Sequence, residues 1–118
     1  MSSKVWARGW EFEDDFIKQY SLLYLDYIRD KVCCVTGDTN SEPHHLKAVG
    51  MGNDREKPMP EHFTAVPLCR NMHTQVHNMG LYAFTTKHKI NLWEESHYYF
   101  IGFLVKEGLL QVYKGEES

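Results

Sequence analysis

The sequence PLCRNMHTQVHNMG, residues 67–80, and the shorter stretch PHHL, residues 43–46, together decide the fold that we expect. In the longer stretch His73 and His77 stand four residues apart, so on a helix their side chains project from one face. The shorter stretch places two adjacent histidines in a segment typical of a short strand. Neutral imidazole is the commonest metal ligand in proteins. The two stretches therefore supply up to three metal ligands and one spare base, the groups that metal-assisted hydrolysis requires.

The pattern on either side of these stretches predicts a mixture of helices and strands. Apolar residues from Phe12 to Ile28 recur at three- and four-residue steps, which is typical of a helix with one buried face. Asn91 and Glu94 form a capping-box pattern before a second amphipathic run, and Gly80 is expected to end a helix in a left-handed cap. The expected elements are a helix over residues 12–29, turns over 33–41, a strand over 44–49, an exposed loop over 50–61, a strand over 64–68, a helix over 71–79, a helix that follows Asn91, and a frayed tail over 114–118.

Length and composition favour one small cytoplasmic domain. With 118 residues, the chain is expected to form a single domain with one modest core. Its three cysteines make no disulfide framework, so a reducing cytoplasm is the expected compartment. No secretory signal is visible, and no apolar run approaches the roughly 18 residues of a membrane span. A net charge of −3 argues mildly against nucleic-acid binding, although a small basic patch or a bound cation can reverse the local field.

The order of motifs through residues 33–80 resembles that of the HNH, or His-Me finger, nucleases, and most closely that of their small phage-type members. Those proteins read C-x-x-C-G, then H-H and an apolar residue, then G-M-G-x-D-R, then P-L-C-x-x-H-H-x-x-x-H-x-x-G. The matching pieces here are CCVTG at 33–37, HHL at 44–46, GMGNDR at 50–55 and PLCRNMHTQVHNMG at 67–80. The resemblance implies an α+β fold with a ββα-metal core over about residues 43–80, flanked by N- and C-terminal helices, in one HNH-like domain spanning 1–118.

The same resemblance implies a metal-dependent endonuclease that hydrolyses DNA phosphodiester bonds, in the cytoplasm of a bacterium or of a phage-infected host cell. One divalent ion (Mg²⁺, Mn²⁺, Zn²⁺ or Ni²⁺) is expected on His44, His73 and His77, with His45 as the general base. Neighbouring residues of a strand point to opposite faces, so His44 and His45 are expected to have different roles. No membrane partner is expected. Three positive side chains are candidates for contact with DNA phosphates, an ordinary solvated loop being the equally weighted alternative: Lys47, Arg55 and Lys57.

Two positions depart from the family pattern. In relatives, paired cysteines, or cysteine with histidine, hold a structural zinc beside the core. Here Thr36 and Met72 stand where two of the four ligands belong, so only Cys33 and Cys69 remain. Two thiolates do not complete a tetrahedral zinc site, so we expect no structural zinc and a degraded knuckle that packs as apolar side chains. The helix over residues 12–29 is expected to replace part of the lost stabilisation.

Three functions are compatible with these patterns. A DNA endonuclease leads. The main alternative is a catalytically inactive HNH-fold module that binds DNA or protein, because loss of zinc ligands can accompany loss of activity. The third is a different metallohydrolase with a three-histidine site, whereas an H-E-x-x-H metalloprotease is excluded because Thr74 stands where the glutamate base is required. The remaining histidines, His62, His88 and His97, are predicted to be structural or solvated.

Overall fold

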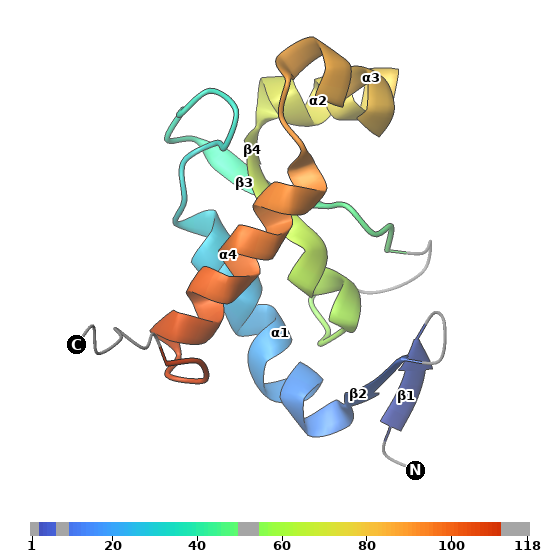
Figure 1. Cartoon of the computed structure of the whole chain (residues 1–118), viewed down its shortest axis with the longest axis vertical. Helices are drawn as coiled ribbons and strands as arrows, with labels where there is room; N and C mark the ends of the chain where they lie inside the picture. The colour runs from blue at the N-terminus through green and yellow to red at the C-terminus, as the bar shows by residue number, and fades with distance from the viewer. Residues whose placement is uncertain (1–2, 7–9, 50–54, 112–118) are drawn as a thin grey trace, which may run out of the picture.

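Four α-helices and two small antiparallel sheets make up the described part of the chain, which is an α+β fold (Figure 1). The computed structural model describes residues 3–6, 10–49 and 55–111. The tail expected over 114–118 lies outside these residues. In chain order the elements are β1 (Ser3–Trp6), β2 (Trp10–Glu13), α1 (Asp14–Arg29), β3 (Ser41–His45), the 3-10 turn η1 (Pro60–Thr64), β4 (Ala65–Cys69), α2 (Arg70–Met79), α3 (Leu81–His88) and α4 (Leu92–Lys106).

The antiparallel pair of β3 and β4 leads directly into α2. Ser41 pairs with Cys69 at one end of this ladder, and His45 pairs with Ala65 at the other. Gly80 follows α2 with φ of 87° and ψ of 160°, a conformation that favours glycine. The positive φ agrees with the expected glycine stop, but the ψ value is extended rather than left-handed helical. α3 starts at the next residue, a helix that the sequence pattern did not predict.

Every residue of β4 is buried, and the strand separates two groups of core side chains. Val66 and Leu68 belong to a group with residues of α2, α3 and the start of α4. Ala65 belongs to a second group, which includes Tyr24 of α1 and Phe103 of α4. Each large apolar side chain that is fully buried contributes roughly 1.5–3 kcal/mol relative to exposure. This two-sided burial fixes β4 between the helices, and with it the strand that carries the adjacent histidines.

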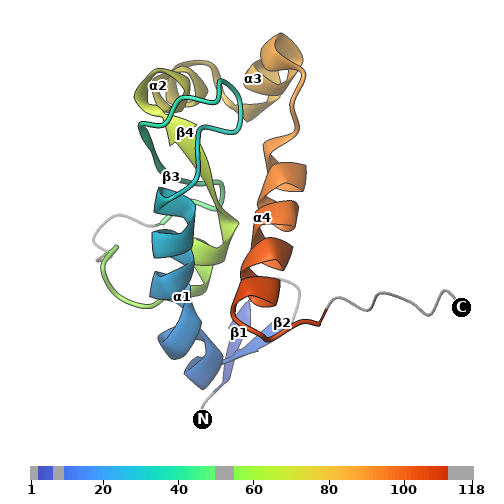
Figure 2. The ribbon, with the colours of Figure 1, turned by 90° about the vertical axis from the view of Figure 1, so that its left-hand side faces the viewer.

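α1 and α4 lie side by side along the length of the molecule, with α2 and α3 at one end (Figure 2). The buried face of α1 follows a helical spacing, and its central member, Tyr24, donates its hydroxyl hydrogen to the Ala65 carbonyl oxygen at 2.9 Å. Burial raises the pKa of Tyr24, so this hydroxyl stays protonated. α1 therefore packs on β4. That this helix replaces part of the stabilisation lost with the zinc site stays a prediction. Its buried residues are Ile17, Ser21, Tyr24, Leu25 and Ile28.

Several element boundaries differ from the expected ones. The expected helix over 12–29 begins at Asp14, because residues 10–13 pair with Ser3–Trp6 as a hairpin. The strand expected over 44–49 spans Ser41–His45, and the one expected over 64–68 spans Ala65–Cys69. The exposed loop expected over 50–61 includes the start of η1, with residues 50–54 outside the described part.

The expected start of α4 is confirmed at its N-cap. Asn91 Oδ1 accepts a hydrogen bond from the Glu94 backbone N–H at 3.1 Å. The buried face of this helix contains Leu92, Ser96 and Phe103, whereas the side chain of Trp93 is 47% exposed. None of the helices in residues 10–49 and 55–111 is both long enough and apolar enough to cross a membrane.

Candidate metal centre and cleft

Three histidines from β3 and α2 converge at the end of the β3–β4 pair. Each of His44, His73 and His77 offers one ring nitrogen, and these nitrogens all lie within 4.8 Å of one another. The rings of His73 and His77 stack with centroids 4.9 Å apart, one helical turn apart on α2. The His44 ring stands nearly perpendicular to that of His73, at 4.6 Å. Among the residues that the structure describes, no other group of three histidine, cysteine or acidic side chains comes this close together.

The spacing of these nitrogens fits a divalent ion after a small adjustment. Tetrahedral ligands at about 2.0–2.1 Å from zinc lie about 3.3 Å from one another, so the widest pair here has to close by up to about 1.5 Å. His44 is buried and His73 is partly buried, whereas His77 is exposed. Side-chain rotation at His77 can therefore supply the closure without disturbing the core. Three neutral imidazoles favour Zn²⁺, Mn²⁺ or Ni²⁺ over Mg²⁺, which prefers oxygen ligands.

Glu42 orients one of the three histidines. His73 Nδ1 lies 2.6 Å from Glu42 Oε2, so it donates its hydrogen to the carboxylate. The other ring nitrogen, Nε2, is then the atom left to bind an ion. A carboxylate behind a ligating histidine fixes its tautomer and makes it a better ligand. The exposed side chain of Arg70 lies 3.2 Å from the second oxygen of Glu42.

Because side chains alternate along β3, its two histidines point to opposite faces of the strand. Residues two apart in a strand share a face, so Glu42 and His44 both face α2. His45 points the other way, and its Nε2 lies 2.9 Å from His62 Nδ1 of η1. His62 is fully buried, and its Nε2 lies 2.8 Å from the Lys57 carbonyl oxygen. His62 therefore belongs to the site through His45, where the sequence indicated only a structural or solvated histidine.

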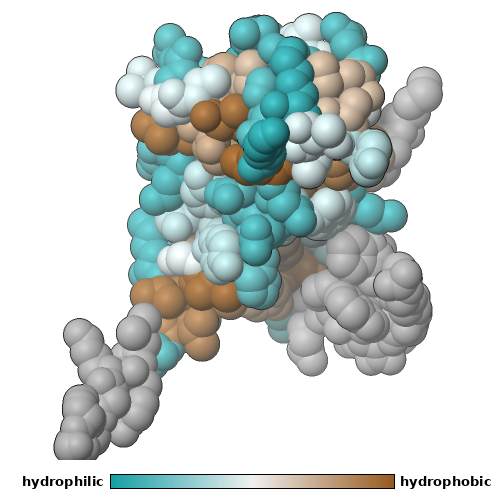
Figure 3. Space-filling model, turned by 45° about the horizontal axis from the view of Figure 1, so that its top comes forward, coloured by the Kyte–Doolittle hydropathy of each residue, from teal (hydrophilic) through white to brown (hydrophobic). Residues whose placement is uncertain are grey.

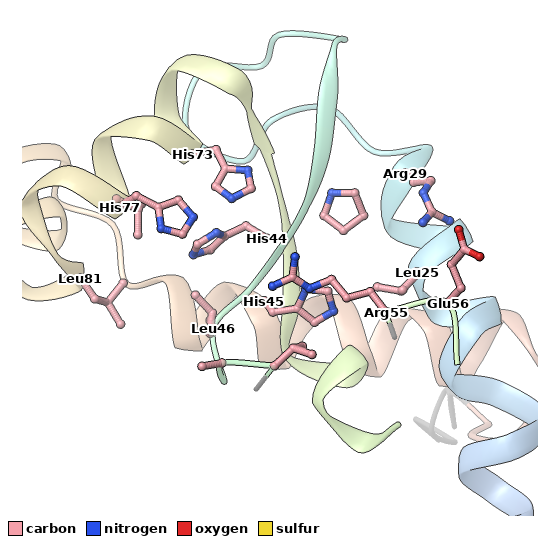
Figure 4. Close-up of a pocket in the computed structure, with 14 residues that line it drawn as sticks. Leu25, Arg29, His44, His45, Leu46, Arg55, Glu56, His73, His77 and Leu81 are labelled. Carbon is pink, nitrogen blue, oxygen red and sulfur yellow. The ribbon is translucent and has the colours of Figure 1, made fainter. Parts of the chain in front are cut away.

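All four of the histidines in the two sequence stretches line one cleft of about 550 Å³. Figure 4 shows His44, His73 and His77 turned toward one another, with His45 and Arg55 farther along the cleft. Leu25 and Arg29 of α1 form part of the opposite side. Hydrophilic side chains cover most of the molecular end near α2 and α3, with apolar side chains between them (Figure 3).

Burial keeps two of the cleft histidines, His44 and His45, neutral near pH 7. Burial is the main effect that lowers the pKa of His44 to about 4, and His73 and His77 lower it further. Burial likewise lowers the pKa of His45 to about 4, assisted by His62 and by the positive charges of Arg55 and Arg29. Neutral imidazole is the form that binds metal ions and that accepts protons.

The three cations expected to contact phosphate are not together. Arg55 lines the cleft, but Lys47 and Lys57 are exposed side chains that do not. Lys57 contributes its backbone carbonyl, to His62. The second cation of the cleft is Arg29, which ends α1 and pairs with Asp26 at 2.7 Å. No motif marked Arg29, whereas Glu42 could have been found from its position two residues before His44.

The positions of the degraded knuckle lie together in the core. Cys33, Cys69 and Met72 are buried in one apolar group, as the sequence predicts. Thr36 donates its backbone N–H to Cys33 Sγ at 3.5 Å, and its hydroxyl lies 3.8 Å from Cys69 Sγ. Burial alone raises the pKa of the Cys33 thiol, but hydrogen bonds from Thr36 and from the backbone of Cys69 and Val35 together outweigh burial and leave the pKa at about 7. The absence of structural zinc stays a prediction.

The fold and the cleft define an α+β protein with a three-histidine cluster and an adjacent fourth histidine. The model of one protein family, DUF968, described as a protein of unknown function, matches residues 17–99, from α1 into α4. The chain therefore belongs to the DUF968 family, and the match includes every residue that lines the cleft. No curated protein and no solved structure matches the chain.

Proposed function

We propose that this protein is a metal-dependent endonuclease of the HNH type that hydrolyses phosphodiester bonds in DNA. The observation that carries the proposal is the division of labour at the end of β3. His44 joins His73 and His77 in a cluster able to hold one divalent ion, while the next residue, His45, lines the same cleft outside that cluster. Hydrolysis of a phosphodiester needs such a pair of functions, an ion at the phosphate and a base for the water.

The order of elements supports the same proposal. β3, β4 and α2 follow one another as two antiparallel strands and a helix, with the histidines at the end of β3 and on the facing side of α2. We propose that this unit is the ββα-metal core of the HNH nucleases, which the motifs over residues 33–80 resemble. In this proposal, α1 and α4 are the flanking N- and C-terminal helices.

Each side chain of the cleft has a role in the proposed reaction. His45 accepts a proton from the water that attacks phosphorus. Arg29 and Arg55 bind non-bridging phosphate oxygens and hold the DNA backbone along the cleft, as positive side chains do at nucleic-acid surfaces. A bound divalent ion supplies the positive charge that stabilises the departing 3′ oxygen. The negative charge of the phosphate raises the pKa of His45 on binding, which increases its basicity where it is needed.

The test is metal-titrated cleavage of duplex, nicked and branched DNA by wild-type protein and by His45→Ala. We expect cleavage that depends on the added ion, and a single-turnover rate about 10²–10⁴-fold lower for His45→Ala, since positioned general bases contribute factors of this size. Metal affinity measured by calorimetry is expected to remain unchanged in His45→Ala. A rate within about threefold of wild type at saturating metal contradicts the role of His45.

The same experiment distinguishes the alternatives. A binding module without activity shifts DNA in a gel but leaves plasmid DNA intact at every ion concentration. A metallohydrolase of another class hydrolyses a small phosphodiester and leaves DNA intact. Nicking of plasmid DNA that requires the ion and is abolished in His73→Ala supports the endonuclease.

A further inference from the structure

We infer that His62 is a positioning residue, which holds His45 in the tautomer protonated at Nε2 and so makes Nδ1 the atom that takes the proton from water. The inference rests on the proposed function of His45 as the general base. It concerns a residue outside the histidine motifs, 17 positions along the chain from His45.

The donors and acceptors in the contacts from His45 through His62 to Lys57 follow from the last partner, a carbonyl oxygen. The Lys57 carbonyl oxygen can only accept, so His62 Nε2, at 2.8 Å, carries a hydrogen. A neutral imidazole has one N–H, so His62 Nδ1 is an acceptor. His45 Nε2, at 2.9 Å, must then be the donor. Neutral His45 has its own single hydrogen on Nε2, which leaves Nδ1 with a free lone pair.

The opposite arrangement is disfavoured by the surroundings of His62. A hydrogen on His62 Nδ1 instead of Nε2 would set a nitrogen lone pair against the Lys57 carbonyl oxygen at 2.8 Å. A hydrogen on both nitrogens requires a charged ring, and the His62 side chain is fully buried. Burial is the largest effect on this group and lowers its pKa, although the Lys57 carbonyl and Glu61 oppose it. His62 is therefore neutral and accepts from His45.

The turn that carries His62 is anchored on both sides, which keeps the acceptor in place. Met59, directly before η1, donates its N–H to Ser21 Oγ at 3.2 Å, and Ser21 donates in turn to the Ile17 carbonyl oxygen. Thr64, the last residue of η1, accepts from the Lys47 N–H at 3.0 Å through its hydroxyl. η1 is thus attached to α1 and to the chain that continues from β3. A catalytic side chain is most effective when its hydrogen-bond partners are preorganised, that is, fixed in position before the substrate binds.

The first experiment reads the hydrogen bond directly and does not depend on cleavage. In protein labelled with ¹⁵N in its histidines, a scalar coupling between His45 Nε2 and His62 Nδ1 arises only across an N–H···N hydrogen bond. The nitrogen that carries the proton identifies the donor. We expect the coupling, with the proton on His45; His45→Gln and His62→Asn assign the signals. No coupling, or a proton on His62 Nδ1, overturns the inference and leaves the proposed nuclease function intact.

The second experiment separates an acceptor from a merely space-filling residue. His62→Leu removes the acceptor, whereas His62→Asn keeps an oxygen close to the former Nδ1 position. We expect single-turnover cleavage about 10–100-fold slower for His62→Leu, a range typical of outer partners of site histidines, and recovery of most of the rate in His62→Asn. The matched control is His88→Leu. His88 also makes a side-chain hydrogen bond, to Gln75 at 2.8 Å, but it lies outside the cleft.

Metal affinity and unfolding temperature complete the test. Calorimetry should give wild-type ion affinity for both His62 variants, because His62 belongs to a chain of contacts separate from the three-histidine cluster. Equal rates for His62→Asn and His62→Leu overturn the positioning role, and so does a rate loss that follows only the loss of stability. If wild-type protein cleaves no DNA while the coupling is present, the proposed function fails and the hydrogen-bond assignment stands.

Discussion

Replacing Glu42 tests whether the three-histidine cluster is a metal site with an oriented ligand. Its carboxylate accepts from His73 Nδ1 at 2.6 Å, with the two side chains 19% and 32% exposed. A hydrogen bond to a charged group contributes about 1.5–3 kcal/mol, and partial exposure moves the value toward the lower end. Loss of an outer carboxylate partner weakens metal binding about 10–100-fold, or about 1.4–2.7 kcal/mol. We expect a dissociation constant for Zn²⁺ about tenfold higher in Glu42→Gln, which keeps an acceptor, and higher still in Glu42→Ala.

Calorimetry of Zn²⁺ binding to each variant supplies the measurement, and Arg70→Ala is the control. Arg70 touches the same carboxylate, but its side chain is 79% exposed, so its removal should change the affinity by less than about threefold. His73→Ala removes a ligand and should reduce affinity more than either Glu42 variant. Wild-type affinity in Glu42→Ala together with strong loss in His73→Ala refutes the role of Glu42. Unchanged affinity of His73→Ala for Zn²⁺, Mn²⁺ and Ni²⁺ refutes the metal site itself.

Three further predictions follow from the cleft, the knuckle and the core. The double variant Arg29→Ala, Arg55→Ala should reduce the slope of log affinity against log salt by about 1.8 on duplex DNA, about 0.9 for each lost phosphate contact. The control Lys18→Ala, at an exposed position early in α1, should leave the slope unchanged. An unchanged slope in the double variant places the DNA elsewhere. Metal analysis after saturation with Zn²⁺ should find one ion per chain, lost in His73→Ala; a second zinc abolished by Cys33→Ser and Cys69→Ser contradicts the degraded knuckle. Tyr24→Phe should lower the free energy of unfolding by about 1 kcal/mol in urea, because it removes the buried hydrogen bond to Ala65, while Tyr98→Phe, at a residue 60% exposed, should not.

Local patterns were enough to predict the positions of the central elements. The four-residue step between His73 and His77 gives one helical face whatever the tertiary structure, and Asn91 caps its helix through a contact three residues away. The strand limits were less well predicted, because His44 to Val49 reads as apolar and extended in isolation. In the structure the ladder ends at His45, and the N–H groups of Leu46 and Lys47 instead bond to the carbonyl and hydroxyl oxygens of Thr64.

Arg29 and His62 could not be found in this way because their roles depend on distant packing. Arg29 reaches the cleft only because α1 lies against β3 and β4. His62 meets His45 only because η1 is attached to α1 through Ser21 and to the β3 continuation through Thr64. Neither contact leaves a periodic signal in the sequence. Glu42 is the intermediate case, since strand alternation places it on the face of His44 once the strand limits are known.

The register between β3 and β4 determines which of the two adjacent histidines faces α2 and the ion cluster and which faces His62 of η1. Side chains alternate with a period of two, so a shift of β3 by one residue would turn His45 toward α2 and His44 toward η1. The two histidines would then exchange faces, and Glu42, which lies on the same face as His44, would turn away from His73. Val66 and Leu68 hold β4 itself in place, because both are fully buried beside α2 and α3. Ser41 Oγ, which donates to the Lys31 carbonyl oxygen at 2.5 Å, anchors the other strand at its start. The buried strand β4 therefore fixes the frame on which β3 presents the cleft histidines, although none of its own side chains lines the cleft.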